Sequence, residues 1–591
     1  MLSREYDCRF RKIEQLRGPW RFQIDQDDLG EVEGWFSRDF DRDEWLKVVV
    51  PGQWDFYDQA LWAYEGIGWY ATEIAADSVH KNGWQRLFFN RVNIHAKVWL
   101  NGRFLGEHVG GHLPFEFSAT PYLSSDSENA LVVRVDNVPR VEWLPGARNI
   151  EWVLYGGILQ PVLLLTTAPV YVSDLGVTAV PEGQRARLIC EAEVTNSSSV
   201  EFHGKVIFRT PPAGSSWIGG TEIVCEPESR TVVSTTVNMP YAERWSPELP
   251  VLYEMSAQLV KEEKILDETS DKFGVRTIEA RGVEILLNGK PIRIRGLNRY
   301  DEYASFGPTV PEDIMRKELI RIKKLGVNLI RVHYPQDPAL LRIMDEIGLL
   351  FMEETSLCWW NPSERSEECS KAVIDATEKT LEDMIKRDKN HPCLVIWSMA
   401  NECATDNDIG INAMRRLMRK ARELDPTRLV TFVIAHDPKG HKAVDEADFA
   451  AINIYFGLFA SLAHHIEEFD SLVRRPSEEQ LRRIREQCPD KPIIVTEFGT
   501  HGISGLRGNA RFTEDYQAAY IRAMWDAISN VPDVTGGVLW CWADYFHRRN
   551  FIGYDGRMLQ SPYGPYGVVT IDRRAKKSLY ELARMYGGEV T

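Results

Sequence analysis

Two apolar runs in this chain each lead into a glutamate: LVIWSMANE at residues 394–402, which ends at Glu402, and PIIVTEFG at residues 492–499, which contains Glu497. Nearly continuous apolar runs are typical of parallel strands that are buried on both faces. In a barrel of such strands the chemistry lies at the C-terminal strand ends, where both glutamates fall. A single glutamate at such a place is about as often a solvated strand end or an ion-pair partner. Two that face one pocket can cleave a glycosidic bond, one as proton donor and the other as nucleophile or base.

The surrounding sequence indicates a barrel. From about residue 276, predicted strands alternate with predicted helices, which is the pattern of a parallel sheet. We expect strands at 292–297, 328–332, 350–354, 394–398, 429–433, 449–454, 493–496 and 537–542. Helical patterns fall between them at 312–325, 338–347, 371–387, 411–424, 478–487 and 513–528. Eight strands in this length predict a closed (β/α)8 TIM barrel over residues 276–591.

The first half of the chain reads as β-structure. Residues 1–170 carry many short strand patterns between turn signals, including a hairpin turn at Asn101-Gly102, and predict a β jelly-roll. Residues 171–275 carry β-branched runs separated by polar turns such as TNSSS at 195–199. That region predicts an immunoglobulin-like β-sandwich. The expected architecture is therefore multidomain, with jelly-roll, sandwich and barrel in this order.

Composition narrows the class of function. At 591 residues the chain is too long for one hydrophobic core. Its net charge of −16 argues against nucleic acid or an anionic membrane as a partner. No secretion signal or membrane-spanning run is recognisable. The nine cysteines are scattered and have no CxxC or CxxH spacing, so they favour neither disulfides nor zinc and fit a cytoplasmic protein.

Polar and aromatic residues at other strand ends complete the expected site. Asn401, directly before Glu402, can hold a substrate hydroxyl and orient the acid. Arg331 and His333 end the second strand; a buried guanidinium near Glu497 would keep that carboxylate ionised. Glu402 must instead stay protonated near neutral pH, which an apolar lining and a negative neighbour achieve. His333 is either a donor to a sugar hydroxyl or a structural histidine.

Three further candidates lie on strands six and eight. Asn453 and Tyr455 end strand six, and a tyrosine hydroxyl can restrain a nucleophilic carboxylate. Trp540, one of 18 tryptophans, can provide a flat floor for a sugar, although aromatic residues are more often part of a core. Glu353 and Glu354 end strand three. They either support the catalytic pair or form a cation site, and the sequence favours neither reading. We predict no metal and no cofactor, because GxSxG, HExxH and phosphate-loop motifs are missing from the sequence.

The segment DKNHPCLVIWSMANE at residues 388–402 closely resembles the acid/base signature of glycoside hydrolase family 2. This family includes β-galactosidases, β-glucuronidases and β-mannosidases, and TEFG at residues 496–499 resembles its nucleophile segment. The resemblance covers the whole chain and implies the same three domains. It implies a retaining reaction in which Glu497 attacks and Glu402 protonates the leaving oxygen, then activates water. It further implies that Asn401, His333, Tyr455 and Trp540 line the sugar pocket.

Several departures from the family pattern concern the substrate. Only Val332 separates Arg331 from His333, where the family usually has two small residues. Glu151 stands where relatives direct an Asp into the sugar pocket. β-Glucuronidases bind the substrate carboxylate through an Asn-x-Lys motif. In this chain YGPYG at residues 563–567 stands in its place. Arg548, Arg549 or Arg557 could supply a positive charge from another direction, so a substrate with a uronic acid of another configuration is still an alternative. NRYDE at residues 298–302 is closer to the galactosidase pattern.

We therefore predict a cytoplasmic, retaining exo-β-glycosidase that acts on terminal sugars of glycosides or oligosaccharides, with β-galactosidase as the first candidate. A β-glucuronidase or β-galacturonidase of the same family is the second candidate. A non-catalytic carbohydrate-binding protein on the same frame is the alternative from a different class, and it would require the loss of one catalytic carboxylate. The sequence leaves the oligomeric state open, a homo-oligomer included.

Overall fold

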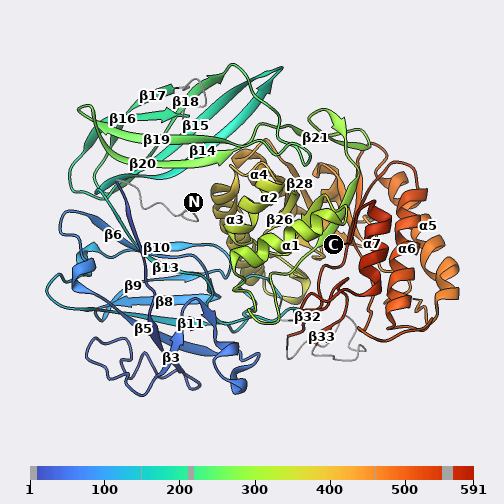
Figure 1. Cartoon of the computed structure of the whole chain (residues 1–591), viewed down its shortest axis with the longest axis horizontal. Coiled ribbons are helices and arrows are strands. Elements are labelled where there is room, and N and C mark those ends of the chain that lie inside the picture. The colour runs from blue at the N-terminus through green and yellow to red at the C-terminus, as the bar shows by residue number, and fades with distance from the viewer. Residues whose placement is uncertain (1–9, 148, 211–217, 460, 549–562, 591) are drawn as a thin grey trace. The chain divides into compact units, whose positions relative to one another are not determined.

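The computed structural model of the chain describes residues 10–147, 149–210, 218–459, 461–548 and 563–590 (Figure 1). The chain divides into two compact units. The first contains Met1–Pro139, Leu154–Glu243 and Leu252–Val275, and the second contains Arg140–Val153, Arg244–Val251 and Arg276–Thr591. Each unit is built from its own sheets and core.

The first unit begins with antiparallel sheets that fit the expected jelly-roll. Their orders are β1-β13-β6-β10, β3-β2-β5-β11-β8-β9 and β4-β12-β7. The central strand β11 is buried on both faces: Leu131 and Val133 contribute to the main core, and Val132 packs in an aromatic cluster with Trp69 and Trp99. The strands are β1 Lys12–Gln15, β2 Pro19–Ile24, β3 Leu46–Val49, β4 Gly52–Gln53, β5 Ile67–Ile74, β6 Trp84–Phe89, β7 Val92–Asn93, β8 His95–Leu100, β9 Arg103–Val109, β10 Phe115–Ser118, β11 Asn129–Asp136, β12 Gly157–Ile158 and β13 Val162–Thr167.

Seven further antiparallel strands form a sandwich in the same unit. One sheet has the order β14-β15-β18 and the other β17-β16-β19-β20. Alternate side chains such as Leu188, Val206 and Leu259 are fully buried between them, which explains the alternating pattern in the sequence. The strands are β14 Val170–Glu182, β15 Arg185–Asn196, β16 Phe202–Arg209, β17 Ile218–Cys225, β18 Ser229–Met239, β19 Tyr253–Lys261 and β20 Lys264–Phe273.

The second unit contains a closed barrel of eight parallel strands, preceded by a small sheet of β21 Ile278–Arg281, β22 Glu284–Leu287 and β23 Lys290–Pro291. The expected fold class is therefore confirmed. The barrel strands are β24 Ile294–Asn298, β25 Leu329–Arg331, β26 Leu350–Glu354, β27 Leu394–Asn401, β28 Leu429–Ala435, β29 Ala450–Asn453, β30 Ile493–Phe498 and β31 Val534–Leu539. The last strand ends three residues before the predicted end because Trp540 and Trp542 belong to the loop that follows it.

Helices follow most of the barrel strands: α1 Glu312–Lys324, α2 Pro338–Ile347, α3 Glu367–Asp388, α4 Asp408–Leu424, α5 Arg475–Gln487, α6 Glu514–Asn530 and α7 Lys577–Tyr586. Local signals set their ends. The Asp337 side chain accepts a hydrogen bond from the Ala339 N–H at the start of α2, and Gly348, with φ 76°, ends it. Between β28 and β29 there is only the 3-10 turn Lys442–Glu446.

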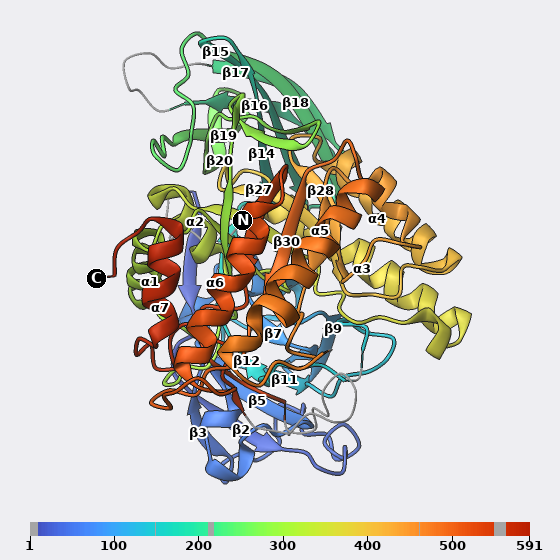
Figure 2. The same cartoon turned by 90° about the vertical axis from the view of Figure 1, so that its right-hand side faces the viewer.

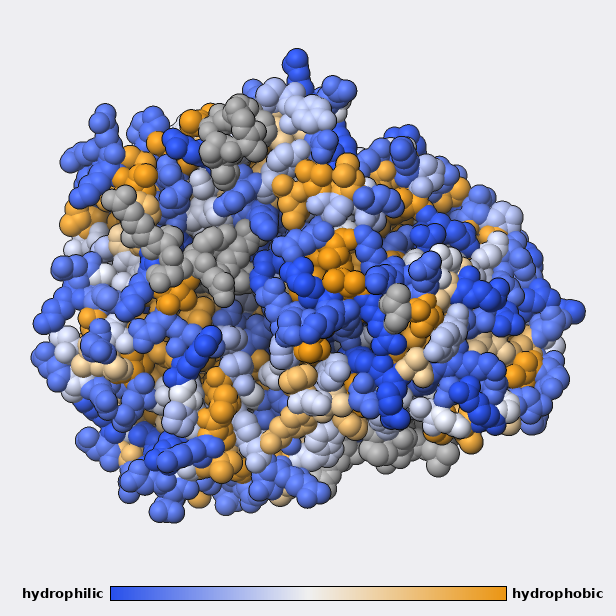
Figure 3. All heavy atoms as spheres, viewed as in Figure 1, coloured by the Kyte–Doolittle hydropathy of each residue, from blue (hydrophilic) through white to orange (hydrophobic). Residues whose placement is uncertain are grey.

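Helix α7 was missing from our expectations. It packs beside α6 (Figure 2), and its apolar residues Leu579, Leu582 and Tyr586 recur at helical spacing before the left-handed Gly587. No described helix has both the length and the apolar character that a membrane span requires. Hydrophilic residues cover most of the face in Figure 3, and apolar residues form small, separate patches there.

Candidate active site

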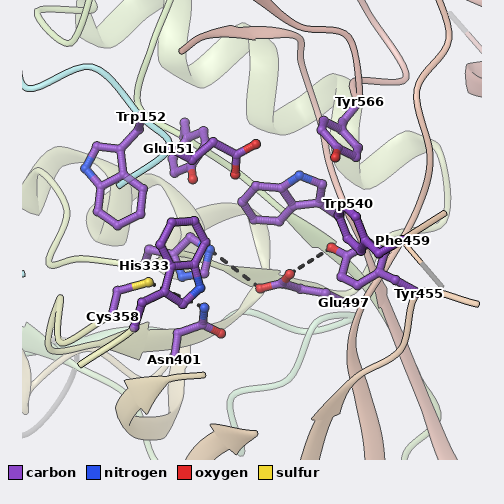
Figure 4. Close-up of a pocket in the computed structure, with 12 residues that line it drawn as sticks. Glu151, Trp152, His333, Cys358, Asn401, Tyr455, Phe459, Glu497, Trp540 and Tyr566 are labelled. Carbon is purple, nitrogen blue, oxygen red and sulfur yellow. Dashed lines mark hydrogen bonds and ion pairs between the residues drawn. The ribbon is translucent and has the colours of Figure 1, made fainter. Parts of the chain in front are cut away.

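The two glutamates lie at the C-terminal end of the barrel. Glu497 is in β30, and Glu402 directly follows β27. Figure 4 shows the pocket at this end. Its wall is formed by twelve residues of the second unit: Glu151, Trp152, Tyr300, His333, Cys358, Trp359, Asn401, Tyr455, Phe459, Glu497, Trp540 and Tyr566. Six of these residues are among those that the sequence predicts for the site: Glu151, His333, Asn401, Tyr455, Glu497 and Trp540.

Glu497 is held at both carboxylate oxygens. Arg331 donates from Nη1 to Oε1 at 2.6 Å, and the Tyr455 hydroxyl donates to Oε2 at 2.8 Å. Arg331 is completely buried and also donates from Nη2 to Glu354 Oε2 at 3.0 Å. Burial alone would lower the pKa of Arg331, but the charges of Glu354 and Glu497 raise it above its usual value. The guanidinium therefore stays charged and offsets the charge of Glu497.

Glu402 lies in a different environment. Its backbone has φ 49°, a left-handed conformation that is strained for a residue with a side chain. Asn453 Nδ2 donates to Oε1 at 2.8 Å, and the indole N–H of the wall residue Trp359 donates to Oε2 at 3.0 Å. Burial, followed by the negative charge of Glu497, raises the pKa of Glu402 to about 7. Glu402 can therefore hold a proton near neutral pH.

His333 and Asn401 connect the pocket to the charged groups behind it. His333 Nδ1 lies 3.0 Å from Glu354 Oε1 and its Nε2 lies 3.5 Å from Glu497 Oε1. Its ring stacks on Trp152 at 5.7 Å. Asn401 accepts from Arg331 Nη2 at 3.0 Å and donates to the sulfur of Cys358 at 3.5 Å. Both residues therefore lie at the pocket wall despite the shortened spacing before His333.

Asn453 differs from its predicted role as a substrate ligand. Neither Asn453 nor Glu402 is among the wall residues, and the amide of Asn453 is occupied by protein groups. Nδ2 donates to Glu402 and, at 3.2 Å, to Asn401, while Oδ1 accepts from the Thr496 hydroxyl at 2.8 Å. Asn453 therefore orients Glu402 from behind the wall.

Glu151 lies across the pocket with one oxygen engaged. Its Oε1 accepts from the Tyr545 hydroxyl at 2.6 Å and lies 3.2 Å from His547 Nε2. Trp540 in turn donates its indole N–H to Tyr545 at 3.2 Å. Sequence reasoning missed Tyr545 and His547, although both closely follow strand eight. Glu151 is thereby fixed as a buried acceptor at the wall.

Glu353 and Glu354 each lie beside an arginine side chain. Glu354 pairs with Arg331 and His333; burial opposes its ionisation, but the charge of Arg331 outweighs this and lowers the pKa of Glu354. Glu353 lies 3.4 Å from Arg387, and burial together with the charge of Asp388 raises its pKa well above its usual value. Within the described ranges, no group of three or more His, Cys, Asp or Glu is arranged to hold a metal ion.

Comparison with known proteins shows the family to which the chain belongs. The family model described as "Glycosyl hydrolases family 2, TIM barrel domain" matches residues 278–589. The sugar binding domain of the same family matches residues 13–168, and a third family 2 model matches residues 170–276. The chain belongs to glycosyl hydrolase family 2. The resemblance found in the sequence is thereby confirmed, and the chain is a glycoside hydrolase.

Relatives of this family 2 enzyme differ in their named substrates. A β-glucuronidase from Paenibacillus borealis is 25% identical over 618 residues, with 98% of each chain covered. A β-galactosidase from Thermoanaerobacter pseudethanolicus is 30% identical over 63% of this chain, which spans about half (49%) of that longer protein. Among solved structures, a β-galacturonidase from Eisenbergiella tayi bound to galacturonate matches with a TM-score of 0.84, 26% identity and 99% coverage of both chains.

The bond from Trp359 to Glu402 generates a prediction about pH. This bond lowers the pKa of Glu402, against the larger raising effects of burial and Glu497. An acid catalyst is active below its pKa, so wild-type kcat/KM should fall as the pH rises through about 7. In Trp359→Phe the lost donor raises that pKa, and the alkaline limb should move upward by as much as ~1 pH unit.

The measurement is the pH profile of kcat/KM on a nitrophenyl glycoside, with Trp525→Phe, which replaces a tryptophan of the outer helix α6, as the matched control. An alkaline limb that stays in place, or moves to lower pH, in Trp359→Phe would contradict the assignment of that limb to Glu402.

Proposed function

We propose that this family 2 enzyme is a retaining exo-β-glycosidase in which Glu497 is the nucleophile and Glu402 the acid and base. The observation that carries the proposal is the opposite environment of the two carboxyls. Glu497 is paired with a permanently charged guanidinium, whereas the pKa of Glu402 is raised to about 7. Cysteine usage favours a reducing, cytoplasmic location.

The proposed reaction has two displacements. A carboxylate oxygen of Glu497 attacks the anomeric carbon while Glu402 gives its proton to the departing glycosidic oxygen, which leaves a glycosyl ester on Glu497. Glu402, now ionised, takes a proton from water as that water attacks the same carbon and releases Glu497. A double displacement of this kind requires the two carboxyl groups to lie about 5 Å apart.

The same electrostatics supports the change of role of Glu402 between the steps. The charge of Glu497 is one cause of the raised pKa of Glu402. When Glu497 becomes a neutral ester, that charge disappears and the pKa of Glu402 falls. A proton donor in the first step thereby becomes a base in the second.

We propose a β-galactoside as the first candidate substrate. Among the twelve wall residues there is no Lys or Arg, and the carboxylate of Glu151 lies across the pocket from Glu497 (Figure 4). A sugar carboxylate at that end would meet the like charge of Glu151 with no Lys or Arg in the described wall to offset it, which is unfavourable at a buried site. Neutral hydroxyls, by contrast, can donate to Glu151. Arg549 and Arg557, which the sequence analysis also considered, lie outside the described residues.

A β-uronide is the second candidate. Two relatives that match over nearly the full length of both chains are a β-glucuronidase and a β-galacturonidase. Arg511 could serve a uronate, because its Nη1 is buried without a hydrogen-bond partner in the described part of the chain. The charge of Arg511 acts near the wall. Burial and, second to it, the charge of Arg511 lower the pKa of His501 to about 3. The ring of His501 lies 4.1 Å from that of the wall residue Tyr566.

Replacement of the acid should affect substrates unequally. In Glu402→Ala, a glycoside with an alkyl alcohol as leaving group should lose on the order of 10³-fold in kcat/KM, because its oxygen must be protonated as it leaves. A dinitrophenyl glycoside, whose leaving group needs no proton, should lose far less. Steady-state kinetics on both glycosides provide the measurement. Equal losses would show that Glu402 is not the proton donor.

A substrate panel separates the two candidate sugars. We expect nitrophenyl β-galactoside to exceed the β-glucuronide, β-galacturonide, β-glucoside and β-mannoside in kcat/KM. Arg511→Gln should leave the ratio of galactoside to uronide turnover unchanged, as should the surface control Arg419→Gln.

A uronide that is preferred by wild type and loses ~10-fold or more in Arg511→Gln alone would instead establish the second candidate. Absence of release from every glycoside in the panel would contradict the proposed activity.

A further inference from the structure

The pocket wall contains an accessible hydroxyl to which none of the described protein groups is hydrogen-bonded. Tyr566 is a wall residue, and its hydroxyl makes no hydrogen bond within the described part of the chain, although it is not sealed from solvent as the hydroxyl of Tyr300 is. The hydroxyls of Tyr455 and Tyr545 are by contrast taken by Glu497 and Glu151. Burial and the nearby charge of Glu151 raise the pKa of Tyr566 well above its usual value. The group is therefore a permanent donor that can also accept.

The backbone that carries Tyr566 is fixed by a buried ion pair. Lys576, with no exposed surface, donates to Asp544 Oδ1 at 2.5 Å and to the Pro565 carbonyl at 3.2 Å. Asp544 Oδ1 also accepts from the Gly567 N–H at 2.9 Å. The residues on both sides of Tyr566 are thus tied to one Lys–Asp pair.

Two more contacts limit the movement of Tyr566. Gln517 Nε2 donates to the Tyr566 carbonyl at 2.9 Å. A β-carbon on Gly567 would lie 2.1 Å from Asp544 N, so this close approach requires glycine. The Tyr566 ring contacts the ring of His501 at 4.1 Å and is stacked on that of Tyr545 at 6.2 Å and 11°. The hydroxyl is therefore held in one direction.

That direction is into the pocket. In Figure 4 the Tyr566 hydroxyl points inward at the end where Glu151 lies, with Trp540 between these two residues and Glu497. A pyranose ring with its anomeric carbon at Glu497 extends its remote end toward Glu151 and Tyr566. A sugar hydroxyl at that end can donate to the Glu151 carboxylate and accept from Tyr566.

We propose that Tyr566 is a specificity-determining residue that hydrogen-bonds a hydroxyl on C3, C4 or C6 of the bound sugar, and that the Lys576–Asp544 pair is its positioning device. The inference rests on the glycosidase function proposed above. It predicts that removal of the Tyr566 hydroxyl has no further effect on a substrate that lacks the partner hydroxyl, because the hydrogen bond between the two groups is then already missing.

The test is a cycle between the enzyme and its substrate. Wild type, Tyr566→Phe and the exposed control Tyr580→Phe are compared on nitrophenyl β-galactoside and its 3-, 4- and 6-deoxy analogues. Tyr566→Phe should lose ~10-fold in kcat/KM on the galactoside and show no further loss on one deoxy analogue. The control should behave as wild type does. Equal losses by Tyr566→Phe on the galactoside and on every analogue would overturn the role of Tyr566.

Variants of the ion pair test the positioning role. Wild type should discriminate between the galactoside and that deoxy analogue, measured as the ratio of their kcat/KM values, and Lys576→Met should reduce this ratio. A smaller folded fraction would lower both values alike and leave the ratio unchanged. Asp544→Asn should act in the same direction. Unchanged discrimination in both variants would remove the positioning role.

Failure of the proposed function would look different. In that case wild type releases nitrophenol from none of the glycosides. If wild type instead turns over uronides, the cycle is measured on 3- and 4-deoxy uronides, and lack of coupling in both would overturn the role of Tyr566.

Discussion

One buried guanidinium connects the parts of the active site. Arg331 ends β25, and its partners come from four other barrel strands. They are Asn298 in β24, Glu354 in β26, Asn401 in β27 and Glu497 in β30. These side chains converge only when the barrel is closed. Breaking a buried ion pair by removal of one partner typically destabilises a protein by about 3–5 kcal/mol, so fold and site depend on the same contacts.

The arrangement gives two chemically identical side chains different properties. Glu497 is next to a fixed positive charge and a tyrosine hydroxyl, whereas Glu402 receives two neutral donors and faces the negative charge of Glu497. Glu402 directly follows the strand in a left-handed backbone conformation, and its side chain accepts from both donors. The separation of roles that we propose thus arises from the neighbours of each carboxyl, and its dependence on the charge of Glu497 links the two steps of the proposed reaction.

The sequence predicts the barrel and the strand-end positions of Glu402 and Glu497 well because both follow from strand periodicity. Glu402 and Glu497 are recognisable as the charged ends of long apolar runs. The residues of the pocket wall are harder to predict from strand periodicity. Trp359, Phe459 and Tyr566 lie on loops whose positions are fixed by distant contacts, and Lys576 and Asp544, 32 positions apart, carry no local signal of their pairing.

The same limit explains the differences at strand ends. Trp540 and Trp542 look like strand residues, yet Trp540 faces the pocket and Trp542 donates to Glu318 of α1. Asn453 looks like a substrate ligand because it ends a strand, but its amide is occupied by Glu402, Asn401 and Thr496. Periodicity identifies the strand, and only tertiary contacts decide what a residue at its end binds.

The most direct measurement is the trapping of the glycosyl-enzyme. A 2-deoxy-2-fluoroglycosyl fluoride of the sugar that the enzyme turns over should inactivate it and add the mass of one fluorosugar, and peptide mapping should locate that mass on Glu497. A fluorosugar attached to another residue such as Glu151 or Glu402, or turnover with inverted configuration and no covalent adduct, would contradict a double displacement at Glu497.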